Sequence, residues 1–164
     1  MRANSHYKTR TKCLARDCTR AYHNAGTEAH AGISGHKFMF SKRNVIAIID
    51  DNLGVLGAMS RLLSALGYCT ELYASAKEFL DEALMTEAIC LIVDVQLGES
   101  CGIQFAQQLA SAGFTFPIVF MSANYSESVK RKAAEIGCVA FLTKPFSADA
   151  LIDTLAALSA RRTA

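Results

Sequence analysis

The chain has 164 residues, 51% of them hydrophobic, so it is long enough for one ordinary domain with a sizeable apolar core. No stretch approaches the roughly 20 apolar residues of a membrane-spanning helix, and no apolar run of the secretory type follows the basic N-terminal residues. The formal net charge of +2 is unevenly distributed, because residues 1–43 carry nine basic and two acidic residues (+7) while residues 44–164 carry eight and thirteen (−5).

Residues 1–43 show no sustained period of two or of 3.6, so we expect a basic, disordered N-terminal extension. An organellar transit peptide is an alternative that this composition allows. The extension has no helix-turn-helix pattern, so we expect at most nonspecific phosphate contacts and no sequence-specific binding of nucleic acid. All four histidines lie in it, which argues against histidine-based acid–base catalysis in the rest of the chain.

From residue 44 onward, apolar runs that fit buried strands alternate with segments of helical periodicity. The expected strands are Val45–Asp50, Tyr68–Tyr73, Cys90–Val93, Pro117–Met121 and Val139–Leu142. The expected helices run from Leu53 to a C-cap at Gly67, from a capping box at Ser75 and Glu78 through Leu84, across Ile103–Leu109, from Ser126 to Ile136, and across Asp149–Leu158. This alternation predicts an α/β domain with a doubly wound, five-stranded parallel sheet.

The six cysteines show no framework spacing, and three of them, Cys69, Cys90 and Cys138, lie in or beside apolar runs. We therefore expect these three to be small buried hydrophobes and the compartment to be a reducing cytoplasm.

Polar residues stand where these strands end. Asp50 and Asp51 follow the first strand, Asp94 the third and Ser122 the fourth, and Lys144 comes just after the fifth. The carboxyl ends of parallel strands meet at one crevice, so we expect a single acidic pocket with one hydroxyl and one ammonium group. Such a set of groups suits a metal ion and a phosphoryl group.

Four segments in this order, VIAIIDDN, LIVDVQL, IVFMSAN and AFLTKPF, resemble the receiver domain of bacterial two-component response regulators. The resemblance covers about residues 44–160 and implies a flavodoxin-like fold that takes a phosphoryl group from a phosphohistidine with Mg²⁺. By this resemblance Asp94 is the phosphoacceptor, Asp50 and Asp51 are the acidic metal-binding pair, and Ser122 is the conserved hydroxyl. Lys144 is then the conserved lysine, with a cis bond to Pro145.

The chemistry also follows from the residues. Three clustered carboxylates repel one another unless a hard dication lies among them, and Mg²⁺ prefers oxygen ligands. We expect Asp51 and Asp94 to be direct ligands, the Gln96 backbone carbonyl to add a third, and Asp50 to act through water. Asp94 would attack phosphorus in line, with Lys144 offsetting charge and Ser122 donating a hydrogen bond.

Signalling is expected when Ser122 moves inward and leaves space for the ring of Phe141, the aromatic switch position of the family. We expect the readout on the face made by the fourth predicted helix, the fifth strand and the fifth helix. The expected partners are a sensor histidine kinase or a histidine phosphotransfer protein and a downstream protein target. We also expect a phosphorylation-dependent homodimer, and we expect no membrane partner.

One departure from the family pattern lies just after Asp94. Gly98 stands where a proline is usual, so we expect a looser loop there.

Only residues 161–164 follow the predicted receiver domain, residues 44–160, as a tail. The sequence therefore resembles a stand-alone receiver, and we expect a regulator that is not an enzyme beyond its own phosphorylation and dephosphorylation.

Rival functions are weaker on the same residues. An aspartyl-phosphate phosphatase would carry a second aspartate two residues after its nucleophile, but Gln96 stands there. A phosphorylation-independent docking module would not need the full acidic set. The turn after Asp51 lacks the glycine-rich phosphate cradle of cofactor-binding Rossmann proteins.

Overall fold

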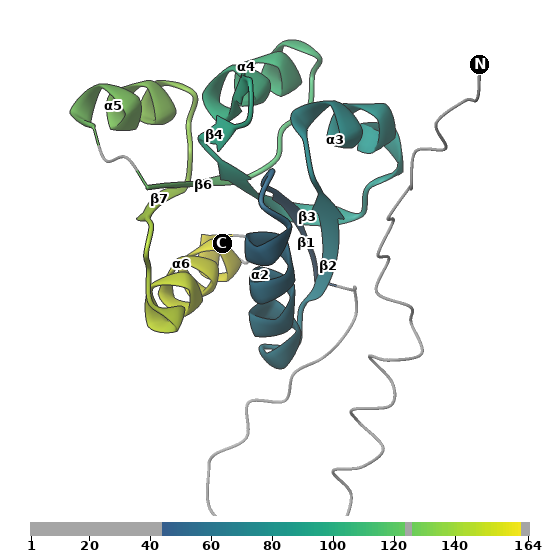
Figure 1. Cartoon of the computed structure of the whole chain (residues 1–164), viewed down its shortest axis with the longest axis vertical. Coiled ribbons are helices and arrows are strands. Elements are labelled where there is room, and N and C mark those ends of the chain that lie inside the picture. The colour runs from purple at the N-terminus through teal and green to yellow at the C-terminus, as the bar shows by residue number, and fades with distance from the viewer. Residues whose placement is uncertain (1–43, 124–125, 162–164) are drawn as a thin grey trace, which may run out of the picture.

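The computed structural model describes residues 44–123 and 126–161, and these residues fold around a five-stranded parallel sheet (Figure 1). The strands in chain order are β1 (Val45–Ile49), β2 (Cys69–Tyr73), β3 (Ala88–Asp94), β6 (Ile118–Ser122) and β7 (Ala140–Thr143). Their order across the sheet is β2-β1-β3-β6-β7, and every neighbouring pair is parallel. The predicted doubly wound, five-stranded α/β sheet is confirmed.

Helices cover both faces of this sheet (Figure 1). They are α2 (Leu53–Ala65), α3 (Ala76–Glu82), α4 (Gly102–Ser111), α5 (Glu127–Glu135) and α6 (Ala148–Arg161). Helices α2 and α6 lie on one face, and α3, α4 and α5 lie on the other (Figure 1). None of the helices in the described ranges is long and apolar enough to cross a bilayer.

The central strands are buried because they are covered on both faces. All five residues of β1 are buried, and the side chains of the last four alternate between two apolar clusters. Ile46 and Ile48 belong to the cluster under α2 and α6, whereas Ala47 and Ile49 belong to the cluster under α3, α4 and α5. A continuous apolar run was therefore the correct sign of a parallel strand.

Local signals fix the helix ends. Asn52 caps α2, since its side chain accepts hydrogen bonds from the backbone N–H of Gly54 (2.9 Å) and Val55 (3.2 Å). Gly67 follows α2 with φ +85°, as expected of a residue that ends a helix in the left-handed region. The predicted capping box at α3 is present with one difference. The Ser75 side chain accepts from Glu78 N–H, but the Glu78 carboxylate accepts from the N–H of Ala74, one residue before the N-cap.

Several sequence predictions differ from the structure. Leu53 and Leu84 have the spacing of a buried helix face but are 71% and 87% exposed. Helix α3 ends at Glu82, and a short 3-10 turn, η1 (Ala83–Met85), follows, so Leu84 lies outside the α-helical face that Phe79 buries. Cys90 is buried as predicted.

The other two cysteines were predicted less well. Cys69 and Cys138 are only half-buried, because they lie at or just before the starts of strands and not in their centres. The predicted N-terminal extension, residues 1–43, lies outside the described residues.

The structure also contains an antiparallel hairpin that the sequence did not predict. Strands β4 (Gln96–Leu97) and β5 (Ser100–Cys101) pair directly after β3. Gly98 has φ +59° in the turn between them, a conformation that glycine adopts without steric cost. The expected loose loop after Asp94 is thus a closed hairpin.

Phe79 is the residue on which the packing of α3 depends most. It is fully buried, and its ring makes edge-on contacts with Tyr73, Phe105 and Phe116 at centroid distances of 5.0, 5.6 and 6.0 Å. We expect Phe79→Ala to lower the free energy of unfolding by about 3–5 kcal/mol, because it leaves a cavity among these rings. Urea denaturation followed by circular dichroism measures the loss, and Leu53→Ala, an exposed truncation, should change it by less than about 0.5 kcal/mol. Equal losses in both variants would contradict this packing.

Candidate functional site

Three carboxylates meet at the carboxyl edge of the sheet. Asp50 and Asp51 directly follow β1, and Asp94 is the last residue of the neighbouring strand β3. One oxygen from each of the three side chains lies within 4.8 Å of the others. The strand-end argument therefore placed these three residues together correctly.

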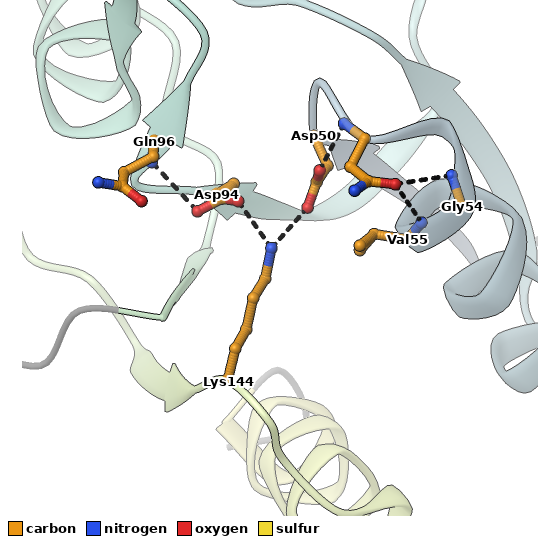
Figure 2. Close-up of polar contacts among 7 residues, drawn as sticks. Asp50, Gly54, Val55, Asp94, Gln96 and Lys144 are labelled. Carbon is orange, nitrogen blue, oxygen red and sulfur yellow. Dashed lines mark hydrogen bonds and ion pairs between the residues drawn. The ribbon is translucent and has the colours of Figure 1, made fainter.

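Lys144 joins two of the three carboxylates. Its Nζ lies 2.7 Å from Asp50 Oδ2 and 2.6 Å from Asp94 Oδ2, so one ammonium group donates a hydrogen bond to each (Figure 2). Lys144 directly follows β7, and its backbone N–H donates to the Ser122 carbonyl. The peptide bond to Pro145 is cis, as the resemblance implied.

Backbone groups hold the remaining oxygens of the two paired carboxylates. The N–H of Asn52 donates to Asp50 Oδ1 at 2.8 Å. The N–H of Gln96 donates to Asp94 Oδ1 at 3.1 Å (Figure 2). Each of these carboxylates thus accepts from one backbone amide and from Lys144. Such fixed donors orient the carboxylate planes before any ligand binds.

The three carboxylates differ in exposure. Asp50 is 0% exposed, Asp94 is 8% exposed, and Asp51 is exposed at the rim. Burial raises the pKa of Asp50, although the hydrogen bonds from Lys144 and Asn52 oppose this rise. Burial alone would lower the pKa of Lys144, but its hydrogen bonds to Asp50 and Asp94 outweigh this effect and raise it. The lysine is therefore a fixed cation at neutral pH.

A pocket of about 650 Å³ opens above these groups. Its lining is Asp50, Asp51, Asn52, Val55, Asp94, Val95, Gln96, Gly98, Ser100, Cys101 and Lys144. Five of the predicted site residues line it, including Gln96. The β4–β5 hairpin forms one of its walls.

Two predicted site residues lie elsewhere. Ser122, the last residue of β6, is 1% exposed and is opposite Thr143 in the parallel pairing of β6 with β7. Phe141 is half-buried on β7 and packs against the apolar cluster under α3, α4 and α5. Neither is among the described residues that line the pocket, although Ser122 is joined to Lys144 through the backbone.

Sequence reasoning missed the part that Asn52 plays. Its backbone N–H holds Asp50 while its side chain caps α2, so one residue links the acidic pair to the first helix. The signal was present, since an asparagine just before a helical apolar pattern is a common N-cap. The walls made by Ser100 and Cys101 were not foreseen, because the β4–β5 hairpin was not.

Gly102 holds the backbone of β3 in close contact with the start of α4. A Cβ at this position would lie 2.1 Å from the Asp94 carbonyl oxygen, much closer than van der Waals contact permits. The N–H of Gly102 also donates to the Val95 carbonyl at 2.9 Å. The position of Asp94 therefore depends on a glycine further along the chain.

Comparison with known families decides what this acidic pocket belongs to. A family model described as the response regulator receiver domain matches residues 46–156. The chain belongs to this family. Receiver domains are phosphoacceptor parts of two-component signalling proteins, and response regulators interact with histidine kinases. The family assignment from the four motifs is confirmed.

Curated relatives agree with this assignment. The response regulator protein TodT of Pseudomonas putida is 35% identical over 124 residues, which are 76% of this chain and 55% of the relative. The transcriptional regulatory protein TdiR of Thauera aromatica is 31% identical over 73% of this chain and 53% of its own length. The chain thus spans about half the length of these relatives.

Solved structures agree on the fold. The chemotaxis response regulator CheY4 of Vibrio cholerae superposes with a TM-score of 0.63 at 25% identity, covering 71% of this chain and 99% of that one. A response regulator receiver protein from Pseudoalteromonas atlantica gives a TM-score of 0.67 at 24% identity, covering 72% of this chain and 98% of its own. These neighbours confirm the receiver fold.

The contact at Gly102 gives a test of how tightly the site of this receiver domain is built. We expect Gly102→Ala to lower the free energy of unfolding by about 1–3 kcal/mol, because the added methyl group displaces the backbone at Asp94. The matched change is Gly57→Ala inside α2, where an added Cβ would lie 3.4 Å from the movable guanidinium end of Arg61. This change should raise the free energy of unfolding by about 0.5–1 kcal/mol. Denaturant titration measures both, and a neutral Gly102→Ala would show that the chain relaxes freely around Asp94.

Proposed function

We propose that this receiver domain takes a phosphoryl group onto Asp94 from a phosphohistidine and signals through a change in its protein contacts. The observation that carries the proposal is the bridging of Asp94 and Asp50 by Lys144 inside a pocket that a third carboxylate completes. We propose residues 44–160 as the receiver domain, residues 1–43 as a separate N-terminal extension and residues 161–164 as a tail. The family match and the described fold support the range given for the receiver domain.

Exposure favours Asp94 over the other two carboxylates as the acceptor. Asp50 is 0% exposed, so it has no access to an incoming donor. Asp51 is exposed at the rim, and the ion pairs of Lys144 go to Asp50 and Asp94 instead. Asp94 combines partial exposure to the pocket with contact to the lysine.

The residues present fit a divalent cation. Three carboxylates and one ammonium leave a formal charge of −2, which one divalent ion would cancel, and every candidate ligand atom is an oxygen, as Mg²⁺ prefers. Asp51, Asp94 and the Gln96 backbone carbonyl would hold Mg²⁺ directly, with Asp50 acting through water. When bound, Mg²⁺ would neutralise charge on the phosphoryl oxygens.

The chain's own groups account for the other parts of the transfer. An oxygen of Asp94 attacks phosphorus, the new P–O bond forms, and the P–N bond of the donor breaks with its electron pair going to the imidazole. Lys144 is already charged and fixed beside Asp94, so it stabilises the negative charge of the phosphoryl group without first having to reorient. The product is an acyl phosphate.

We infer that the switch consists of Ser122 and Phe141. The hydroxyl of Ser122 would donate to the new phosphoryl group, and the half-buried ring of Phe141 would then turn inward. The output face would be α5, β7 and α6, which lie together at the end of the sheet (Figure 1). A sensor histidine kinase or a histidine phosphotransfer protein would be the donor, and a downstream protein, or a second copy, would bind this face.

The cysteines bear on the compartment, and the residues after Asp94 bear on the rival functions. The six cysteines of the sequence show no framework spacing, which supports a reducing cytoplasm. We propose a regulator without turnover of other substrates, because no carboxylate stands two residues after Asp94 to act as a general acid. A docking module that ignores phosphorylation is the competing proposal, and the acceptor variant separates the two.

Intact-mass measurement tests the acceptor directly. With Mg²⁺ and acetyl phosphate the full chain should gain one phosphoryl group, while Asp94→Asn should gain none, because an amide is not a competent nucleophile. Asp81→Asn is the matched control, since Asp81 is exposed and forms its ion pair with Lys77 on α3, away from the pocket. Removing Mg²⁺ with a chelator should slow the native reaction by more than about tenfold.

The Asp94 variants also distinguish a phosphoacceptor from a docking module that ignores phosphorylation. Phosphorylation of Asp94→Asn at the native rate would move the acceptor to another residue. Unchanged partner binding and biological output in Asp94→Ala would favour the docking module.

Phe141 lacks the hydroxyl of the tyrosine that is common at this position of the family, so its inward state leaves no polar group to satisfy. We expect Phe141→Tyr to shift the equilibrium toward the outward state, by about tenfold for one unsatisfied hydroxyl. Fluorinated aromatic labels followed by NMR, with and without the phosphoryl mimic beryllofluoride, measure the two populations. Leu158→Met, a volume-conserving change in the apolar cluster under α2 and α6, is the control. Identical equilibria in the native chain and the Phe141→Tyr variant would remove the hydroxyl argument.

A further inference from the structure

Three large apolar side chains lie exposed close together in sequence at the end of α3 and in η1. Leu80, Leu84 and Met85 are 38%, 87% and 71% exposed. We call these three residues the α3–η1 patch. Single exposed apolar residues are ordinary on protein surfaces, but three within six residues mark a place where another segment gains by binding.

Acidic residues are frequent in the segment that contains the α3–η1 patch. Glu78, Asp81, Glu82 and Glu87 lie within or just beside it in sequence, and Lys77 is the one basic residue of the stretch 76–87. The formal charge of this stretch is therefore −3. A partner that fits the patch should combine apolar side chains with positive charge.

One segment of this chain has that composition and starts close by. Residues 37–43 read KFMFSKR, with three large apolar residues, three basic residues and no acidic residue. The segment joins β1 through Asn44, and Val45 at the start of β1 is opposite Ala88 at the start of β3. Met85 is only three residues before Ala88.

Residues 37–43 are long enough to reach the α3–η1 patch from the start of β1. Neighbouring strands are about 4.8 Å apart and three residues span at most about 10 Å, so Met85 lies within about 15 Å of Val45. Seven residues extend up to about 24 Å, more than the separation that they have to cover.

We propose that residues 37–43 bind the α3–η1 patch of the same chain. Phe38, Met39 and Phe40 cover Leu84 and Met85, and the three basic residues face the acidic ones around the patch. The short tether gives this segment an effective concentration in the millimolar range at the patch, so it outcompetes a second copy at ordinary protein concentrations.

The bound segment lies away from the phosphorylation pocket. The α3–η1 patch is at the amino edge of the sheet, because η1 leads into β3, whereas the acidic pocket is at the carboxyl edge where β3 ends. The proposal thus does not require phosphorylation, and its test succeeds or fails independently of the acceptor role of Asp94.

Zero-length crosslinking of the full chain tests the contact. A carbodiimide joins a lysine amine to a carboxylate only when the two are in contact, so we expect amides from Lys37 or Lys42 to Asp81, Glu82 or Glu87 in the monomer fraction. Peptide mass spectrometry identifies them. Leu84→Ser with Met85→Ser should reduce their yield by about tenfold, because it removes most of the apolar contact area.

Two matched controls keep the test decisive. Ile152→Ser changes an equally apolar residue, 37% exposed on α6, and should leave the yield unchanged. Arg43→Glu should lower the yield of the Lys37 and Lys42 crosslinks, whereas Arg10→Glu, with the same charge change outside the segment, should not. Crosslinks confined to dimers, absent from the monomer, or insensitive to the patch variants would overturn the proposal.

Discussion

The mutual repulsion of three carboxylates at one edge of a parallel sheet is the constraint on which the rest of this structure depends. Asp50, Asp51 and Asp94 hold oxygens within 4.8 Å of one another, and a single ammonium group, that of Lys144, neutralises one of their three charges. Such a cluster persists only if the surrounding chain forces it. The apolar strands supply that force, because β1 and β3 are buried on both faces and pack rigidly beneath their terminal aspartates.

The same constraint explains why backbone groups gather at this edge. The N–H groups of Asn52 and Gln96 each donate to a paired carboxylate, and Gly102 permits the chain after β3 to return within contact of Asp94. At Asp50, burial raises the pKa of the carboxyl group, and the hydrogen bonds from Lys144 and Asn52 partly offset this rise. The site is therefore preorganised for a cation and an anion that bind together, which is what a phosphoryl transfer with a metal ion requires.

Much of this was predictable from the sequence, and the misses have a common cause. The strands, their order along the chain and the meeting of Asp50, Asp94 and Lys144 follow from apolar runs that end in polar residues, because parallel strands impose one shared edge. The β4–β5 hairpin, the exposure of Leu84 and the half-burial of Cys69 did not follow. They depend on where a helix stops, a strand starts or a turn closes, which short-range periodicity does not specify.

Strand β3 also determines whether events at the two edges of the sheet influence each other. It begins at Ala88, near the α3–η1 patch, and ends at Asp94 in the pocket, so it is the shortest path between them. Its last five residues are all buried, and close-packed interiors resist small continuous shifts. Coupling between the edges would need a second discrete packing of β3 against β1 and β6. Past an irregularity between Ala88 and Cys90, β3 keeps one parallel register with these neighbours up to Asp94. A bound N-terminal segment should therefore leave the chemistry at Asp94 unchanged while it covers the opposite edge.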